Sequence, residues 1–293
     1  MAEQQKYAIL DTDFVSKANI IKTEDHVLAD EVLAFPGYSF FCHQKMKEEL
    51  ADHGGREAQV WLENKIDTGE IDCYSDEKIL SEMSRYVQNS CFLYYRSFLK
   101  QGCDIFSAEF YSQYFIPLDE MIDRGEYDQE RFLKVLHFCE NQIGHQKSYG
   151  EIKAFVLAQT IKFIYNTEAY IFCSDDFGAR QGFANGAQIP CISILSVFLK
   201  LRLLGRMMEE VEPYFQSFLQ WCLDRKNPQT HVKIWLFKDG SDKREKVPLE
   251  TVLYDIYEGL YYARKDGDLQ KVRRIIEAGT LSEERRRRHG YHV

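Results

Sequence analysis

A pair of adjacent carboxylates follows a short apolar run in the second half of the chain. The run covers residues 169–173, and Asp175 and Asp176 come just after it. An apolar run bounded by polar residues is typical of a buried strand in a parallel sheet, and open α/β sheets gather their chemistry at the carboxyl ends of such strands. Residues 7–10, followed by Asp11, repeat the pattern near the start of the chain. The sequence therefore predicts that two strands end in one acidic pocket.

Two further acidic positions fall within segments that have a helical pattern. Glu48 and Glu49 lie in a predicted helix over residues 44–52, and Glu151 opens another that continues over residues 152–165. Carboxylates that share a pocket repel one another, and their pKa values rise unless a cation binds. Mg²⁺ and Mn²⁺ favour oxygen ligands, and such an ion activates water against a phosphodiester. Each acid alone is typical of a solvated surface, but the four places together predict metal-assisted phosphodiester hydrolysis.

Apolar strand patterns and helical patterns alternate around these acids. The predicted strands cover residues 7–10, 38–42, 71–74, 169–173 and 190–194. The predicted helices cover residues 14–21, 25–33, 44–52, 57–66, 152–165, 177–185 and 195–208. This alternation predicts an α/β fold with a central, mostly parallel sheet.

A long helical pattern that is rich in aromatic residues interrupts the alternation over about residues 76–148. Stripes of aromatic residues at helical spacing are typical of a packed core, and we expect a core here rather than a surface for base stacking. The segment is therefore predicted to be a helical insertion.

The pattern changes again after residue 208. A helix is predicted over residues 213–223 and a strand over residues 232–237, and residues 246–252 either return as its hairpin partner or begin the next helix. Further helices are predicted over residues 251–264 and 269–278. We expect this part of the chain to be an α+β appendage.

Two short segments of the appendage invite a functional interpretation. Residues 263–279 resemble half of an ankyrin repeat, but one copy cannot form a stable array, so a plain helical hairpin is the expected structure. The tail over residues 283–293 contains four consecutive arginines at positions 285–288. These arginines either contact RNA phosphates, with a salt-dependent affinity, or belong to a solvated tail.

Composition narrows the class of protein. The 293 residues, 45% of them hydrophobic, suffice for the core of one or two domains. No apolar run approaches the roughly 18 residues of a transmembrane helix, and the polar residues 1–6 lead directly into a strand, so we expect no membrane span, no signal peptide and a cytoplasmic location. The net charge of −9 argues against a surface that binds nucleic acid over its whole extent, but it allows an enzyme with an acidic, metal-loaded site.

The eight cysteines form no C-x-x-C pair and mostly have apolar neighbours. Zinc sites and disulfide frameworks normally show closer pairing. We therefore expect reduced, mostly buried thiols.

The acidic motifs and their order resemble those of the PIN-domain ribonucleases, the fold of many bacterial toxin nucleases. The resemblance covers about residues 6–205. Its five segments are I-L-D-T-D-F-V around Asp11, K-E-E-L around Glu49, G-E-I-K-A-F-V-L-A around Glu151, S-D-D-F-G-A-R around Asp176, and I-P-C-I-S at residues 189–193. The long insertion and the appendage depart from the minimal family pattern, and the third acid is Glu where Asp is commoner.

The resemblance implies a three-layer α/β/α fold, with a PIN-like nuclease domain over residues 1–208 that contains the insertion, and an appendage with a basic tail over residues 209–293. It also implies an endoribonuclease that uses Mg²⁺ or Mn²⁺. The implied catalytic residues and metal ligands are Asp11, Glu49, Glu151 and Asp176. RNA is the implied substrate, and the family also allows a homodimer and an antitoxin-like inhibitor protein as partners.

The resemblance gives supporting roles to the neighbouring polar residues. Asp13 and Asp175 are implied as auxiliary metal ligands; because adjacent strand residues point to opposite sides, Asp175 is not expected to face the pocket as its neighbour does. Thr12 and Ser174 are implied to hydrogen-bond the ligands or the substrate phosphate, with local capping as an equal alternative. Arg180 either contacts the substrate phosphate or pairs with a core carboxylate, and we favour the pair.

Two other functions account for part of the sequence. In a haloacid-dehalogenase-like phosphatase, Asp11 is the nucleophile, Asp13 the general acid and base, and Lys162 an available lysine. That interpretation leaves Glu49 and Glu151 without a role. In a non-catalytic PIN-like module, the insertion and the appendage bind RNA or a protein partner. We favour the nuclease because it uses all four acidic positions.

Overall fold

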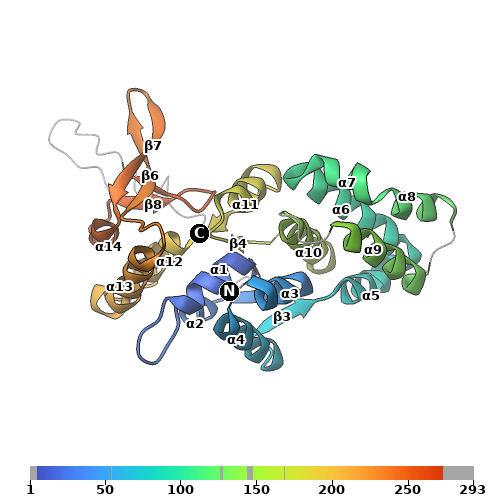
Figure 1. The fold of residues 1–293 in the computed structure, drawn as a ribbon, viewed down its shortest axis with the longest axis horizontal. Coiled ribbons are helices and arrows are strands. Elements are labelled where there is room, and N and C mark those ends of the chain that lie inside the picture. The colour runs from blue at the N-terminus through green and yellow to red at the C-terminus, as the bar shows by residue number, and fades with distance from the viewer. Residues whose placement is uncertain (1–4, 54, 126–127, 144–147, 168, 273–293) are drawn as a thin grey trace.

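A parallel sheet of five strands forms the centre of the computed structural model, which describes residues 5–53, 55–125, 128–143, 148–167 and 169–272 (Figure 1). Its strands are β1 (Lys6–Leu10), β2 (Tyr38–His43), β3 (Ile71–Tyr74), β4 (Ile171–Cys173) and β5 (Cys191–Ile192). Their order across the sheet is β3-β2-β1-β4-β5, and every neighbouring pair is parallel. The predicted α/β class and the five predicted strands are confirmed.

The strand order reverses between β1 and β4. The chain runs outward from β1 through β2 to β3, and it then returns to add β4 and β5 on the other side of β1. In open α/β sheets, ligands bind at the carboxyl ends of the strands where the order reverses. Leu10 lies opposite Cys173 in the register, and the N–H of Asp11 donates to the carbonyl oxygen of Cys173 at 3.0 Å. The first residues after β1 and β4 are therefore side by side at this reversal.

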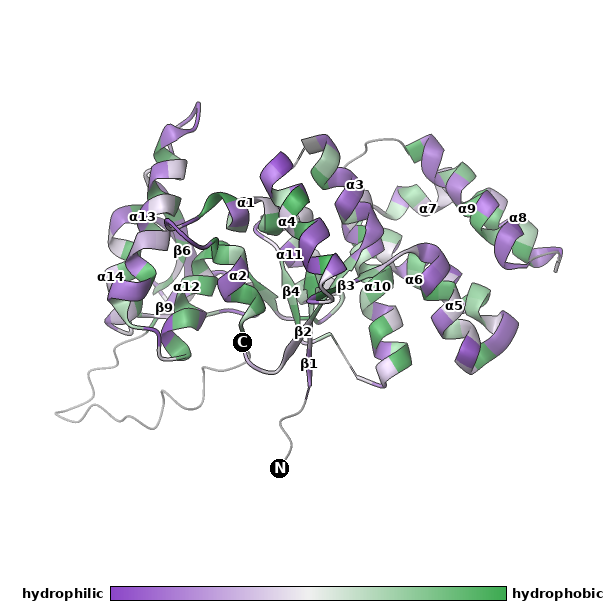
Figure 2. Ribbon diagram, turned by 90° about the horizontal axis from the view of Figure 1, so that it is seen from below, coloured by the Kyte–Doolittle hydropathy of each residue, from purple (hydrophilic) through white to green (hydrophobic). Residues whose placement is uncertain are grey.

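Helices cover both faces of the sheet. They are α1 (Thr12–Ile20), α2 (Leu28–Leu33), α3 (Gln44–His53), α4 (Arg56–Asp67), α10 (Tyr149–Tyr165), α11 (Phe177–Gln181) and α12 (Ile194–Leu203). Alternate residues of β1 point to opposite faces, so Ala8 packs in one buried cluster with Phe14, and Ile9 packs in another with Phe155. Figure 2 shows the apolar strands enclosed between helices. A sheet buried on both faces is consistent with a three-layer α/β/α fold.

The predicted insertion is helical and lies to one side of the sheet (Figure 1). It contains α5 (Asp76–Val87), a 3₁₀ turn (Gln88–Ser90), α6 (Cys91–Phe106), α7 (Ala108–Tyr114), α8 (Ile116–Asp123) and α9 (Gln129–Ile143). Most of its aromatic residues are in the core, as expected. Tyr95, Phe115 and Phe132 are fully buried, and the rings of Phe92 and Phe132 lie 5.1 Å apart. The insertion packs through α6 and α5 on α10, which also contacts the sheet.

A second sheet forms in the C-terminal part, opposite the insertion (Figure 1). Its elements are α13 (Met208–Asp224), β6 (His231–Lys238), β7 (Ser241–Pro248), a 3₁₀ turn (Leu249–Thr251), α14 (Val252–Tyr257), β8 (Tyr261–Ala263) and β9 (Leu269–Lys271), with strand order β7-β6-β9-β8. Both alternatives for residues 246–252 hold in part, because residues 246–248 end the hairpin partner β7 and residues 249–252 lead into α14.

Two helical predictions in this part are wrong. The helix predicted over residues 251–264 ends at Tyr257, and residues 269–271, predicted to begin another helix, form a strand. Gly259 and Gly267 adopt left-handed φ angles of +71° and +74°, which interrupt a helix, and β9 then pairs with the middle of β6. The plain helical hairpin expected over residues 263–279 is wrong for the same reason up to residue 272, and so is the half-ankyrin resemblance. The rest of that segment and the four arginines at 285–288 lie outside the described residues.

Two predicted helices near the site also end early. The helix predicted over residues 195–208 ends at Leu203 because Gly205, with φ +88°, breaks it, and α13 begins at Met208. The helix predicted over residues 177–185 is α11 followed by a wider π turn from Gly182 to Gly186.

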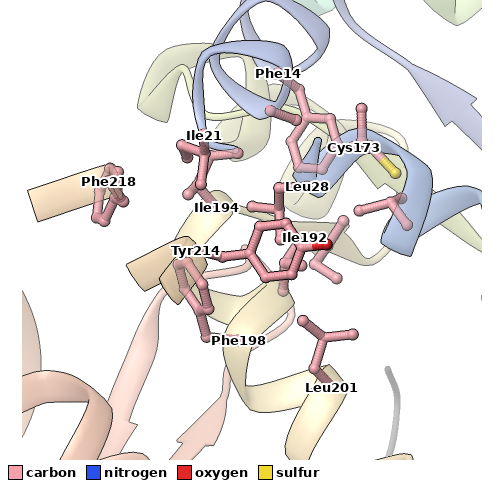
Figure 3. Close-up of a cluster of buried hydrophobic side chains, with 14 of the residues drawn as sticks. Phe14, Ile21, Leu28, Cys173, Ile192, Ile194, Phe198, Leu201, Tyr214 and Phe218 are labelled. Carbon is pink, nitrogen blue, oxygen red and sulfur yellow. The ribbon is translucent and has the colours of Figure 1, made fainter. Parts of the chain in front are cut away.

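The C-terminal part shares a hydrophobic core with the first sheet (Figure 3). Phe14 and Ile21 of the N-terminal part lie in the same cluster as Phe198, Tyr214 and Phe218. The rings of Phe198 and Phe215 meet edge to face at 5.2 Å. The residues after 208 therefore complete one layer of the central fold.

Two expectations about composition can be compared with the structure. All eight cysteines are free, and all but Cys73 are buried, as predicted. Among the residues that the structure describes, none of the helices has the length and apolar character needed to cross a membrane.

Candidate functional site

Asp11 lies at the point where the strand order reverses. Asp11 is the N-cap residue of α1, but its side chain makes no capping hydrogen bond, so its carboxylate is available to the site. The hydroxyl of Ser174, which follows β4, donates to Asp11 Oδ2 at 2.7 Å. The predicted role of Ser174 as a partner of an acidic ligand therefore has a direct contact, and this contact fixes one oxygen of Asp11.

Glu49 reaches the same place from α3. The hydroxyl of Thr12 donates to Glu49 Oε2 at 2.7 Å. The Glu49 carboxylate rests against Gly150 at the start of α10, where a Cβ atom would lie 2.6 Å from Glu49 Oε1. No real Cβ atom makes so short a contact, so a larger residue at position 150 would push the Glu49 carboxylate away from the start of α10, where Glu151 is the next residue.

The carboxylates influence one another strongly. Burial raises the pKa of Asp11 well above its usual range, and the charge of Glu151 and, more weakly, that of Glu49 raise it further. Burial also raises the pKa of Glu151, with Glu49 and Asp176 adding to the effect. Asp11, Glu49, Glu151 and Asp176, which come from four separate segments of the chain, are therefore close enough to influence one another electrostatically, although no three of them have carboxylate oxygens within 4.8 Å of one another in the described structure.

These four carboxylates have no cationic partner in the described part of the chain. No lysine, arginine or histidine there forms an ion pair with Asp11, Glu49, Glu151 or Asp176. Three of these acids are half-buried and Asp176 is exposed, and several neighbouring acids without a counter-charge are unfavourable unless a cation neutralises them. Because every donor in the set is an oxygen, the residues fit a hard divalent cation such as Mg²⁺ or Mn²⁺.

Asp13 and Asp175 lie at the edge of this group, and Lys17 neutralises them. The Lys17 ammonium donates to Asp13 Oδ2 at 2.7 Å and to Asp175 Oδ2 at 2.8 Å. The other oxygen of Asp175 accepts the backbone N–H of Ile194 at 3.2 Å. Both oxygens of Asp175 are therefore engaged. The sequence analysis overlooked Lys17, although its position four residues after Asp13 on a helix was a signal for this pair.

Asp176 keeps a carboxylate oxygen available. Its Oδ1 accepts the N–H of Ala179 at 2.8 Å and caps α11, and its own N–H donates to Ser174 Oγ at 3.2 Å. No described residue donates to Oδ2, and the side chain is exposed. This geometry agrees with the preference for Asp176 over Asp175 as the ligand.

The Arg180 guanidinium makes structural contacts within the protein. It is 4% exposed, its Nη2 donates to Asp268 Oδ1 at 2.7 Å, and its Nε donates to the carbonyl oxygen of Asp266 at 2.8 Å. Its Nη1 donates to the carbonyl oxygen of Ser174 at 3.3 Å. The favoured interpretation, a pair with a core carboxylate, describes this arrangement, and a substrate contact does not. Arg180 instead attaches the loop of Ser174 to the C-terminal part.

A buried ion network lies beside the acidic site. Lys153 of α10 is 1% exposed, and its ammonium lies 2.8 Å from both carboxylate oxygens of Asp76 and 2.5 Å from Glu140 Oε1. Burial favours the neutral amine, but the two carboxylates outweigh it and raise the pKa of Lys153. Burial likewise opposes ionisation of Asp76, but the Lys153 charge outweighs it and holds the pKa of Asp76 well below its usual range.

Three other side chains complete the network. The hydroxyl of Tyr95 donates to Asp76, and the hydroxyl of Tyr149 donates to Glu140 at 2.5 Å. A backbone N–H donates to His43 Nδ1, so Nε2 carries the ring proton and donates it to Asp76 at 3.1 Å. Every charge in the network therefore has a close partner.

The network connects the insertion to the two helices that carry site residues. Asp76 begins α5, and Lys153 follows Glu151 by two residues on α10. His43 ends β2 immediately before α3, which carries Glu49. The sequence analysis missed all three, although a lysine inside the apolar helix pattern and an acid just after the third strand were visible signals.

The network also brings Asp76, His137 and Glu140 within the spacing of a metal site, with ligand atoms within 4.8 Å of one another. The Lys153 ammonium already lies against both carboxylates of this group. A divalent cation there would have to displace a buried lysine that satisfies them. We therefore interpret the group as an ion network and not as a metal centre.

No protein-family model matches the chain, and neither a curated protein nor a solved structure matches it. The functional interpretation consequently depends on the motifs, the sheet topology and the geometry of the four carboxylates.

Proposed function

We propose that the protein is a metal-dependent endoribonuclease with a PIN-like fold, which hydrolyses RNA phosphodiesters. The observation that carries this proposal is the mutual electrostatic influence of Asp11, Glu49, Glu151 and Asp176, without a counter-charge from the described residues, beside the point where the strand order reverses. The close approach of Gly150 to Glu49 supports it, because it lets the start of α10, where Glu151 is the next residue, lie against the Glu49 carboxylate.

Each residue of the site has a definable task in this reaction. A bound Mg²⁺ or Mn²⁺ supplies Lewis-acid stabilisation of the phosphodiester oxygens and lowers the pKa of a water molecule. Asp11, Glu49, Glu151 and Asp176 supply the oxygens that would hold it. The hydroxyls of Thr12 and Ser174 each occupy one carboxylate oxygen, which fixes the direction of the other. The substrate phosphate would meet an acidic site neutralised by the metal.

The geometry weighs against the phosphatase alternative. Asp13, its general acid and base, is held by Lys17. Lys162 is exposed and lies eleven residues from Glu151 along α10, which is about 16 Å of helix. A fluoride mimic of phosphate that binds at Asp11 would favour the phosphatase. A non-catalytic RNA or protein module would instead keep partner binding while showing no metal binding in titration.

The adjacent residues Glu48 and Glu49 give a matched test of the nuclease. Glu49→Gln removes a ligand oxygen and is expected to reduce Mn²⁺-dependent cleavage of a fluorescently labelled single-stranded RNA by about 100-fold or more. Glu48→Gln is expected to stay within about twofold of the wild type, because Glu48 is exposed and pairs with Lys45 on the surface. Equal activity of the two variants would contradict the proposal, as would cleavage that persists in EDTA.

Metal binding should depend on pH above the range of ordinary carboxylates. The pKa values of Asp11 and Glu151 are raised, so both groups retain protons above the usual value of about 4, and the protons must leave when a cation binds. Affinity for Mn²⁺ is therefore expected to fall as the pH is lowered from 8 towards 5. Titration calorimetry in buffers of different ionisation enthalpy measures the released protons. Glu151→Gln should release fewer, and an affinity that stays constant over this range would contradict the assignment.

A further inference from the structure

The outer face of the second sheet combines aromatic rings with cationic side chains. In the register of β6 and β7, Trp235 lies opposite Arg244, and Lys233 lies opposite Lys246. Residues directly opposite each other share a face, and the pairing through β9 places Tyr262 of β8 on this face as well. The stacking face, as we call it, comprises Phe177, Lys233, Trp235, Phe237, Arg244, Lys246, Tyr262 and Arg264.

The two faces of this sheet have different surroundings. Val232, Ile234 and Leu269 point into the core and are buried. Lys233, which alternates with them along β6, is exposed, and Phe237 is 40% exposed. The stacking face is therefore accessible at Lys233 and Phe237, with Trp235 between them half-buried.

The rings and guanidinium groups form a column that begins at the acidic site. Phe177 comes directly after Asp176, and the guanidinium carbon of Arg244 lies 4.2 Å from the centre of its ring. The same guanidinium lies 5.7 Å from the ring of Trp235, and that of Arg264 lies 4.2 Å from it on the way to β8. Alternating rings and guanidiniums provide flat surfaces of the kind on which nucleic-acid bases stack.

The acids close to this face are already paired. Asp268 accepts hydrogen bonds from Arg180 and lies 3.1 Å from Arg244. Asp242 lies 3.4 Å from Arg264. These carboxylates hold the guanidiniums in place and leave little negative charge to repel a polyanion.

Positive charge remains available on the face. Lys233 and Lys246 are exposed, and neither forms an ion pair with a described residue. The Nε of Arg244 is buried and has no hydrogen-bond acceptor, although buried donors nearly always have one. The cations stand out because the chain as a whole carries a net charge of −9.

We propose that the stacking face binds a single-stranded polynucleotide and leads it to the acidic site. Bases would stack on Trp235 and Phe237, and Lys233 and Lys246 would neutralise the phosphates. Because the column has Phe177 at one end, next to Asp176, a polynucleotide bound on this face would continue towards the four carboxylates. The identification of that polynucleotide as the RNA substrate rests on the proposed nuclease function, whereas binding itself does not.

The test measures binding separately from cleavage. The full chain is titrated in EDTA into a fluorescein-labelled twelve-nucleotide oligouridylate, and anisotropy is recorded at several salt concentrations. Lys233→Gln with Lys246→Gln is expected to weaken binding about tenfold and to reduce the slope of log K against log salt by about 1.4, the value for two phosphates on a single strand. Phe237→Ala is expected to weaken binding about tenfold with the slope unchanged, because it removes stacking and no charge.

The same hairpin supplies a matched control. Lys238 and Lys243 are exposed and lie on the opposite face of β6 and β7, where they pair with Glu245 and Asp239. Lys238→Gln with Lys243→Gln changes the net charge equally and should leave both affinity and slope near those of the wild type. Circular dichroism of each variant checks that the hairpin is folded.

The outcomes separate this inference from the proposed function. Face-dependent binding supports the stacking face even if the protein cleaves no RNA, and a DNA oligonucleotide of the same length that competes on the same residues supports it as well. Equal losses from the two lysine pairs would overturn it, since general charge would then explain binding. Competition by a poly-glutamate peptide as strong as that by RNA would also overturn it. If the protein cleaves RNA but none of the stacking-face variants has altered RNA binding, the proposed nuclease function stands and the stacking face is rejected.

Discussion

Asp11→Asn is expected to abolish Mn²⁺-dependent RNA cleavage and, at the same time, to stabilise the metal-free protein. The loss of activity, about 100-fold or more, follows from the removal of a ligand oxygen at the centre of the four carboxylates. The gain in stability follows from electrostatics, because burial and the charge of Glu151 make ionised Asp11 unfavourable in the folded state. Activity and stability should therefore change in opposite directions.

The sign and pH range of the stability effect can be worked out. The pKa of Asp11 is higher in the folded than in the unfolded state, so the folded state binds more protons and wild-type stability falls as the pH rises above about 4. The advantage of Asp11→Asn should be absent near pH 4 and largest above the folded pKa. The size of the gain at neutral pH follows from how far the folded pKa lies above the unfolded one, at about 1.4 kcal/mol per unit.

Urea unfolding in EDTA between pH 4 and pH 8 measures this effect. Asp72→Asn is a suitable control, because Asp72 lies on the surface in an ion pair with Lys78 and its replacement should change stability by less than about 0.5 kcal/mol at any of these pH values. A destabilised Asp11→Asn would show that Asp11 is not under electrostatic strain. The proposed function fails if Asp11→Asn and Asp176→Asn both retain Mn²⁺-dependent cleavage.

The largest loss of stability is expected from Lys153→Met. The methionine fills much of the lysine volume, but it leaves the carboxylates of Asp76 and Glu140 buried near each other without a cation. Removal of one partner of a buried ion pair costs about 3–5 kcal/mol. This loss is a large part of the free energy of unfolding of a typical protein, which is roughly 5–15 kcal/mol. Urea unfolding measured by circular dichroism gives the value.

Two further variants identify the cause of this loss. Lys162→Met makes the same change at an exposed position on the same helix and should alter stability by less than about 0.5 kcal/mol. Asp76→Asn combined with Lys153→Met should lose less than the sum of the two single variants, because the pair is removed together. Additive losses would contradict a direct interaction, and so would a Lys153→Met protein as stable as the wild type.

The sequence predicted the strands and the acidic positions well where a local residue pattern determines them. The strands before Asp11 and Asp176 were predictable because apolar runs that end in polar residues need no distant partner to be identified. The order of the acids, together with the rule for strand ends, then predicted that they meet. The convergence of Glu49 and Glu151 on this edge depended on the family resemblance, because nothing local places the start of one helix beside another.

The features that were missed all depend on distant partners. Residues 269–271 have a helical pattern, but β6 lies alongside and they form a strand. Lys153 has a pattern typical of a buried helix face, and only the positions of Asp76 and Glu140 explain why a charge is stable there. Arg244 and Trp235 belong to different strands, and their stacking follows from a register that the sequence does not reveal.

The contacts of Arg180 make the C-terminal part a support of the acidic site. Its guanidinium is buried against Asp268, and a Cβ atom at Gly267 would lie 2.9 Å from the carbonyl oxygen of Cys191, so the turn at residues 266–268 fits directly onto the first sheet. A chain shortened before this turn would leave a buried arginine without its carboxylate in the loop that carries Asp176. The C-terminal part and the acidic site are therefore coupled, so that a shift of the turn at residues 266–268 would be felt by the loop that carries Asp176.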